Sequence, residues 1–140
     1  MYTGILHATD LTKNHFEMCE KSVEIAKRFK APLYLLHVIE LPPTLQLAQG
    51  LGFSEIEDPT LLLNDAKAVL STLGETFNIP EKHLFVEVGS IKQHTFDKLK
   101  ALHCQLIIIG HHTPSNMPVC LGSTAQLIVQ EATCDVLTLK

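Results

Sequence analysis

The segment of this chain whose residue types could bind a ligand runs from Gly110 to Thr124. It begins Gly110-His111-His112-Thr113, continues for eight residues and closes on Gly122-Ser123-Thr124. A glycine at the end of a buried strand and a Gly-Ser-Thr that opens a helix can present backbone N–H groups to an anion. A plainer interpretation is one turn glycine and one helix cap, and the spacing alone favours it.

Asp10 is the second candidate, because it directly follows the first apolar run of the chain. Its carboxylate could accept hydrogen bonds from an adenine or a ribose. It could equally be a loop residue that caps the following helix near Thr12, and the residue types do not separate these two interpretations. A phosphorylated aspartate of the response-regulator kind is less favoured, since that site needs further acidic residues and the neighbours here are Thr9 and Leu11.

The histidines and cysteines do not have the spacing of a metal site. The chain has eight histidines and four cysteines, but no HxxxH, HxH or CxxC pattern, so we predict no metal site. His7 and His37 lie within apolar strands, where hydrogen-bonded core histidines are the ordinary outcome. Cys120 has no identifiable base nearby in the sequence, so no catalytic thiol is predicted. The other cysteines are expected to be reduced thiols: Cys19, Cys104 and Cys134.

The composition is that of one globular domain, which we expect to span residues 1–140. Hydrophobic residues make up 46% of the chain and charged residues 19%, and the formal net charge is -4. This charge argues against a nucleic-acid partner, because phosphate backbones are bound by clustered Lys and Arg. The first residues do not resemble a signal peptide and no apolar run is long enough to cross a membrane, so a cytoplasmic location is expected.

Short apolar runs alternate with longer segments of helical period, which predicts βαβ units and a parallel sheet. The expected strands are residues 4–9, 33–39, 83–88, 105–110 and 136–139. The expected helices are residues 14–29, a segment that starts at Pro59 after an Asp58 cap and ends before Pro80, residues 90–103 and residues 123–132. Residues 41–57 are predicted to be an exposed connection.

The same patterns predict details of the helices and the sheet. Ser90 with Gln93 and Ser123 with Gln126 have the spacing of capping boxes, and the run from Leu106 to Ile109 should lie at the centre of the sheet. The first helix should bury one stripe of residues: Phe16, Cys19, Val23, Ile25, Ala26 and Phe29. The second should bury Leu62, Ala66, Val69, Leu70, Leu73 and Phe77.

Open parallel sheets bind ligands at the carboxyl ends of their strands, beside the point where the strand order reverses. Three segments are expected at that edge: Thr9-Asp10-Leu11, His37-Val38-Ile39 and the loop that begins at Gly110.

These segments carry a resemblance to the universal stress protein family. The family has a nucleotide signature of Gly, two residues, Gly, nine residues and then Gly-Ser or Gly-Thr, and this chain matches it at Gly110 and at Gly122-Ser123. The stretches LHATDLT, LLHVIE and LIIIGHH resemble the family's first, second and fourth strands. The resemblance implies a doubly wound five-stranded parallel sheet in the order 3-2-1-4-5 with four helices, of the adenine nucleotide alpha hydrolase-like kind.

The chain departs from the signature at two points. Thr113 stands where the family has its second glycine, and the loop after it is one residue short. A β-branched residue rarely adopts the positive φ that glycine adopts freely, and Pro114 and Pro118 lack N–H groups. The GHH version of the loop resembles the universal stress protein A branch, whose members are regarded as not binding ATP, whereas Gly122-Ser123-Thr124 is closer to the ATP-binding branch.

The resemblance therefore implies a non-enzymatic, cytoplasmic stress-response protein that acts as a regulatory homodimer and binds ATP weakly or not at all. The alternative is an ATP-binding switch of the same family, and ATP or AMP is the ligand to consider. A conventional enzyme is not supported, since the chain has no G-x-S-x-G, Walker or Rossmann motif. The residues predicted to contact a nucleotide are Thr9, Asp10, Val38, Gly110, Thr113, Gly122, Ser123 and Thr124.

The homodimer is expected to form through the last apolar strand, Val136 to Leu139. A strand at the edge of a sheet is a template for pairing with a second chain, and the family resemblance points to the same strand. Replacing Leu137 with proline is expected to weaken such a dimer, because proline removes an N–H.

Overall fold

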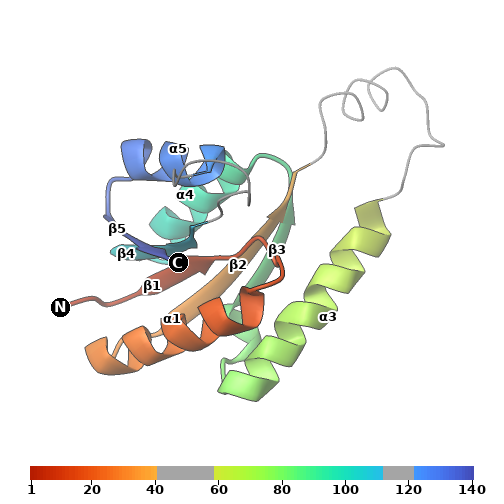
Figure 1. The fold of residues 1–140 in the computed structure, drawn as a ribbon, viewed down its shortest axis with the longest axis horizontal. Coiled ribbons are helices and arrows are strands. Elements are labelled where there is room, and N and C mark those ends of the chain that lie inside the picture. Colours follow the sequence, from red (N-terminus) through yellow and green to blue (C-terminus); the bar gives the residue numbers. More distant parts are fainter. Residues whose placement is uncertain (41–58, 112–121) are drawn as a thin grey trace.

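The computed structural model describes residues 1–40, 59–111 and 122–140 (Figure 1). The predicted exposed connection, the Asp58 cap, Thr113 and Cys120 lie outside the described residues. The strands are β1 (Ile5–Ala8), β2 (Leu33–Ile39), β3 (Leu84–Val88), β4 (Leu106–Gly110) and β5 (Asp135–Leu139). The helices are α1 (His15–Phe29), α3 (Pro59–Phe77), α4 (Ile91–Ala101) and α5 (Ser123–Glu131), with a short 3-10 helix η1 (Glu81–His83) before β3.

The five strands form one parallel sheet in the order β3-β2-β1-β4-β5, which confirms the predicted topology. Ile5 of β1 is in register with Leu33 of β2 on one side and with Leu106 of β4 on the other. The strand order reverses at β1, because the chain first adds strands on one side of it and then crosses to the other side. This reversal creates the place at the carboxyl ends of β1 and β4 where such folds bind ligands.

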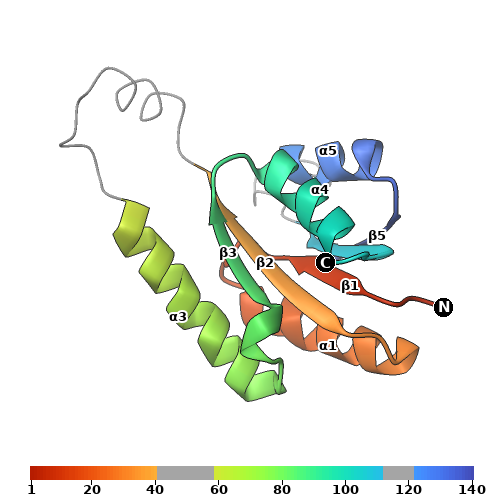
Figure 2. The same cartoon turned by 180° about the vertical axis from the view of Figure 1, so that it is seen from behind.

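Helices cover both faces of the sheet, so the strands read as apolar runs and not as alternating ones. Figures 1 and 2 show α1 and α3 on one face and α4 and α5 on the other. The first face packs Ile5, Leu35 and Ile108 against apolar residues of α1 and α3. The second packs Leu6, Leu36 and Ile107 against α4 and α5. Each strand thus contributes alternate side chains to two separate cores.

The prediction that Leu106 to Ile109 lies at the centre of the sheet was wrong. The middle strand is β1, and β4 lies between β1 and the edge strand β5. All four residues are nevertheless buried. Their apolar character therefore indicates that helices cover the strand on both faces. It does not indicate the position of the strand in the sheet.

Both predicted buried stripes were wrong at end positions. Phe16 and Phe29 of α1 are 49% and 39% exposed, and Leu62 of α3 is 48% exposed. Phe16 lies against Phe77 of α3, with ring centroids 5.0 Å apart. Phe29 packs edge-on against Tyr2 at 4.8 Å. The middle positions of both helices are buried as predicted: Cys19, Val23, Ala26, Ala66, Leu70 and Leu73.

The two predicted capping boxes had opposite outcomes. The Ser90 hydroxyl accepts the Gln93 N–H at 3.2 Å, so Ser90 caps α4 as predicted. Ser123 was predicted to cap α5, and this was wrong. The N-cap is Gly122, in an extended conformation, and its carbonyl accepts the Gln126 N–H at 2.9 Å. Ser123 is therefore already the first residue of the helix, where its side chain no longer faces the following N–H groups.

Element boundaries differ from the predicted ones by one or two residues. His83 belongs to η1 and not to β3, and α4 ends at Ala101, with the turn to β4 formed by Leu102 and His103. Among the described residues, no helix combines the length and the apolar character that a membrane span requires.

Candidate functional site

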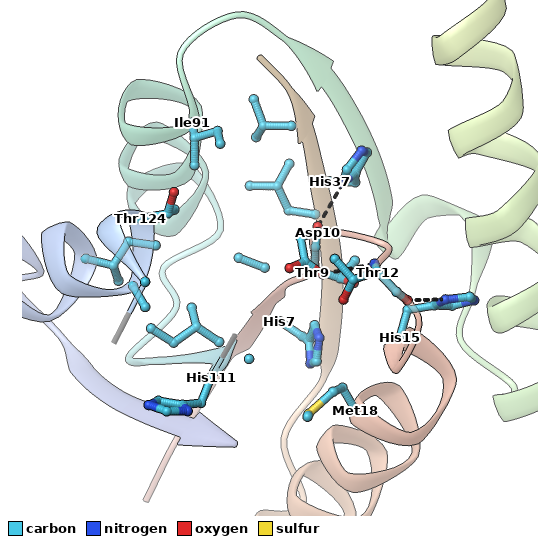
Figure 3. Close-up of a pocket in the computed structure, with 18 of the residues that line it drawn as sticks. His7, Thr9, Asp10, Thr12, His15, Met18, His37, Ile91, His111 and Thr124 are labelled. Carbon is cyan, nitrogen blue, oxygen red and sulfur yellow. Dashed lines mark hydrogen bonds between the residues drawn. The ribbon is translucent and has the colours of Figure 1, made fainter. Parts of the chain in front are cut away.

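A cavity of about 400 Å³ opens at the carboxyl ends of β1, β2 and β4 (Figure 3). It lies at the reversal point of the strand order, between the start of α1, the start of α4 and the start of α5. Seven of the eight residues predicted to contact a nucleotide line it: Thr9, Asp10, Val38, Gly110, Gly122, Ser123 and Thr124. Thr113, the eighth, lies outside the described residues, and a contact of any of the eight with a nucleotide stays a prediction.

The turn from β1 to α1 is held by two side chains of the site. The Thr9 hydroxyl accepts the Leu11 N–H at 3.1 Å, and Oδ1 of Asp10 accepts the Thr12 N–H at 3.0 Å. Leu11 between them has a φ of 55°, a left-handed conformation that costs a non-glycine residue about 1–2 kcal/mol. The two hydrogen bonds offset this cost and keep the turn at the rim of the cavity.

Asp10 therefore has a local structural role, as one of its two predicted interpretations proposed. It does not cap the helix itself, because α1 begins at His15 and its N-cap is Asn14. A carboxylate carries about four lone-pair sites on its two oxygens, and one Oδ1 bond uses only one of them. The local role and a contact to a ligand are compatible.

Two histidines of the cavity wall are fixed by backbone carbonyls. Nδ1 of His37 donates to the Thr9 carbonyl at 2.8 Å, and Nδ1 of His15 donates to the Thr12 carbonyl at 2.8 Å. A carbonyl oxygen can only accept, so Nδ1 carries the proton in both rings. Nε2 is then the ring atom of each histidine left for a further partner.

His7 lines the cavity from β1 and is 1% exposed. Its Nδ1 bonds the Ser22 hydroxyl of α1, and that hydroxyl donates its own proton to the Met18 carbonyl at 3.0 Å. The hydroxyl must therefore accept from His7, which places the histidine proton on Nδ1. Burial lowers the pKa of His7 to about 4, against a smaller opposite effect of Asp10. The prediction of a hydrogen-bonded core histidine is confirmed.

The first turn of α5 supplies the donors of the site. The N–H groups of the first residues of a helix have no partner within it, and those of Ser123 and Thr124 belong to this first turn. No side chain of the described residues caps this end. The end of the helix therefore presents free donors and the positive end of its dipole to the cavity.

No Lys or Arg is among the described residues that line the cavity, and Asp10 is the acidic residue among them. A polyphosphate would therefore meet backbone donors but no fixed cation along this part of the wall. Sequence reasoning missed the wall contributed by His15, Met18 and Ile91. Only the position of Ile91, directly after a capping serine and a strand end, could have signalled it.

The thiols of the described residues have raised pKa values, and no metal-binding cluster lies among those residues. Cys19, Cys104 and Cys134 are free thiols. Burial raises the pKa of Cys19 to about 12 and that of Cys104 to about 11. Within the described ranges, no three His, Cys, Asp or Glu side chains gather as a metal ion would require.

The chain is similar to known proteins over its whole length. The model of the universal stress protein family matches residues 1–140. Universal stress protein A homolog 2 of Coxiella burnetii is 32% identical over 141 aligned positions, which cover 99% of this chain and 95% of the relative. Universal stress protein A homolog 1 of the same organism is 31% identical, covering 97% and 94%.

Solved structures show the same fold. A universal stress protein from Archaeoglobus fulgidus superposes with a TM-score of 0.70 at 18% identity, covering all of both chains. A universal stress protein in complex with cAMP superposes with a TM-score of 0.69 at 15% identity, covering 99% of this chain and 97% of that one. With the family model matched throughout, relatives above 30% identity and the predicted strand order confirmed, this chain belongs to the universal stress protein family.

Proposed function

We propose that this chain is a cytoplasmic stress-response protein that acts as a regulatory homodimer. Its cavity holds an adenosine nucleotide with a single phosphate in preference to ATP, and the protein works by binding and not by catalysis. The observation that carries the proposal is the cavity at the strand-order reversal. It combines an apolar part near Val38 with free backbone donors at the start of α5.

The shape of the wall supports a nucleoside with one anionic group. Leu36, Val38 and Ile109 offer an apolar surface for a base, and Asp10 lies at the rim, where a ribose or amino group could donate to it. The first turn of α5 can take one phosphate on its N–H groups. A volume of about 400 Å³ is at the lower part of the range of about 300–1,000 Å³ found for small-molecule sites.

A triphosphate is disfavoured because the described cavity wall lacks a cationic side chain and the loop sequence departs from the family signature. The described wall contains no Lys or Arg, and the loop has Thr113 in place of a glycine, two prolines and one residue fewer than the family signature. The structural neighbour bound to cAMP holds a ligand with one phosphate, and such a ligand is the kind proposed here. The alternative within the family is an ATP-binding switch that uses the same cavity.

Titration calorimetry with adenosine, AMP, cAMP and ATP tests the proposal. We expect AMP or cAMP to bind more tightly than ATP. A dissociation constant for ATP below about 10 µM, roughly 7 kcal/mol of binding, would favour the ATP switch instead. Changing Thr113 to Gly and inserting one residue after it should strengthen ATP binding, because it restores the family's loop length and backbone freedom.

Ser123 allows a matched pair of variants. Ser123→Pro removes the N–H at the first helical position, where proline is well tolerated, whereas Ser123→Ala removes only the hydroxyl. If the backbone donor holds the phosphate, Ser123→Pro weakens AMP binding by about tenfold or more and Ser123→Ala does so far less. Adenosine binding should be unchanged in both, and an equal loss for adenosine would contradict the assignment of the phosphate to α5.

A further inference from the structure

A second cavity, of about 970 Å³, lies at the opposite end of the sheet from the nucleotide cavity. It is bounded by the amino-terminal residues, the end of α4 and the turn that leads from α5 into β5. Figures 1 and 2 show this turn at the end of the molecule where the N-terminus lies. Two of the residues that line the cavity are cysteines, Cys104 and Cys134.

The two cysteines are neighbours across adjacent chain segments. Cys104 precedes β4 and Cys134 precedes β5, and the Asp135 N–H donates to the Gln105 carbonyl at 3.1 Å. The pairing of Leu106 with Asp135 therefore sets Cys134 beside Gln105, one residue from Cys104. Segments about 4.8 Å apart with a rise of about 3.3 Å per residue place such diagonal Cα atoms about 6 Å apart. Disulfides span about 4.4–6.8 Å between Cα atoms.

Both thiols also lie on the same side of the sheet. Cys104 belongs to the core between the sheet and helices α4 and α5, and Cys134 packs against that same core. Cys104 is 8% exposed and Cys134 is half-buried, so the cavity gives a small reagent its easier access to Cys134. We propose that Cys104 and Cys134 form a reversible disulfide when the protein meets a peroxide, which makes this cavity an oxidation site.

The reaction balances with hydrogen peroxide as the oxidant. The thiolate of Cys134 attacks one peroxide oxygen, the O–O bond breaks, and water leaves with Cys134 as a sulfenic acid. The Cys104 sulfur then attacks the Cys134 sulfur, the S–S bond forms, the S–O bond breaks and a second water leaves. Two thiols lose two electrons in total and one peroxide becomes two waters. A dithiol reductant restores both thiols.

The reaction is slow at neutral pH and accelerates with rising pH. Burial raises the pKa of Cys104 to about 11 and also raises the pKa of Cys134, and each thiol carries a protonated majority at pH 7. Because the thiolate is the reacting form, the rate of disulfide formation should rise by up to about tenfold between pH 7 and pH 8.

The test treats the reduced, full-length protein with hydrogen peroxide and maps the bonds by mass. Trypsin cannot separate Cys104, Cys120 and Cys134 from one another, because the sequence has no Lys or Arg between Lys100 and Lys140. Cleavage at Glu131 isolates Cys134, and cyanogen bromide at Met117 separates Cys104 from Cys120. We expect a mass loss of two hydrogens, a Cys104–Cys134 linked pair of peptides, and reversal by dithiothreitol.

Variants identify each sulfur. Cys104→Ala should leave Cys134 as a sulfenic acid that dimedone traps, and Cys134→Ser should abolish the cross-link. Cys19→Ser is the control, since Cys19 is also buried but lies in the core of the opposite face, and this variant should form the cross-link at the wild-type rate. Treating Cys120→Ser in parallel removes that thiol as a competitor without touching the proposed pair.

Two results would overturn the proposal. One is four intact thiols in the folded wild type after peroxide has oxidised the same chain in denaturant. The other is a cross-link that joins Cys120 or Cys19 in preference to the proposed pair. A cross-link that forms in the wild type and in Cys19→Ser, and is lost in Cys134→Ser, supports it.

Discussion

At the scale of single residues, the sequence predicts whether a side chain is buried better than it predicts that side chain's hydrogen-bond partner. His7 and His37 were predicted to be satisfied within strands, and both make hydrogen bonds. Their partners could not be predicted: Ser22 is fifteen residues from His7 and Thr9 is twenty-eight residues from His37. A strand residue meets whichever helix is packed on it, and that packing is a property of the whole fold.

The burial of His7 predicts acid sensitivity. Its pKa is lowered to about 4 in the folded chain, whereas an unfolded histidine titrates near 6.5. Between these two pH values the unfolded state binds a proton at His7 and the folded state does not. The contribution of His7 to the free energy of unfolding is therefore complete above about pH 6.5 and is lost as the pH falls towards 4. The loss attributable to this group is roughly 3 kcal/mol.

Urea denaturation between pH 7.5 and 4.5 measures this loss. The free energy of unfolding of His7→Leu should depend less on pH than that of the wild type, by up to the amount given above. Ser22→Ala removes the hydrogen bond but leaves the ring buried, so it should keep the acid sensitivity. Parallel pH curves for His7→Leu and the wild type would assign the acid sensitivity to other groups.

Thr95 of α4 is a second residue at which stability can be predicted. It is fully buried, and its hydroxyl is without a hydrogen-bond partner among the described residues. Valine has nearly the same shape and no polar group to desolvate, so Thr95→Val should raise stability by about 1 kcal/mol. Thr72→Val is the control, because Thr72 is exposed and bonds the Ala68 carbonyl at 3.1 Å. A loss of stability in Thr95→Val, measured as a lower Tm, would contradict the prediction.

At the scale of elements, the pattern of apolar runs predicted the five strands and the four α-helices within two residues at each described end, but it did not predict the short helix η1. It also predicted the edge at which Asp10, Val38 and Gly122 meet, because carboxyl ends of parallel strands share one edge. It did not predict that Phe16 would face α3 and leave its ring half exposed. The helical spacing of apolar residues predicts which residues share a face of the helix. It does not predict how much of that face is covered by the element packed against it.

Ser90 before α4 and Ser123 in α5 allow the stability contributed by a helix-capping serine to be measured. Ser90 accepts the Gln93 N–H and Ser123 makes no such bond. Ser90→Ala should therefore lower stability by about 1 kcal/mol, and Ser123→Ala should leave it within about 0.5 kcal/mol. Thermal unfolding without nucleotide measures both, and equal losses would mean that the hydrogen-bond difference carries no energy.

At the scale of the whole molecule, the sheet has two edges, β3 and β5. The side chains of β5 are already used: Val136 packs on one core, and Leu137 and Leu139 pack on the other. A second copy of the chain would therefore pair with the backbone of β5. Only the N–H and carbonyl groups of β5 that point away from β4 can take part in such pairing. The register therefore decides which residue a proline should replace.

In a parallel pair, the N–H and carbonyl of one residue point to one neighbouring strand and those of the next residue to the other side. Asp135 donates to Gln105 of the β4 side, and the Leu139 carbonyl accepts from His111 at 2.6 Å. Leu137, between them, therefore also faces β4. The expectation that Leu137→Pro weakens a dimer stays a prediction, but this change would also break the ladder between β4 and β5, so it does not test the dimer by itself. The residues of β5 whose backbone groups point away from β4 are Val136 and Thr138.

Thr138→Pro is thus the variant that tests the proposed dimer. Thr138 is exposed, and proline is tolerated on an edge strand when its missing N–H faces outward. If two copies pair through β5, this change removes a backbone bond at the interface, together with its symmetry mate. We expect the dimer dissociation constant from sedimentation to rise by about tenfold or more, with little change in monomer stability.

Thr138→Ala keeps the N–H and should dimerise like the wild type. A Thr138→Pro protein that dimerises as tightly as Thr138→Ala would place the interface elsewhere, and a wild-type chain that is monomeric at micromolar concentration would contradict the homodimer itself.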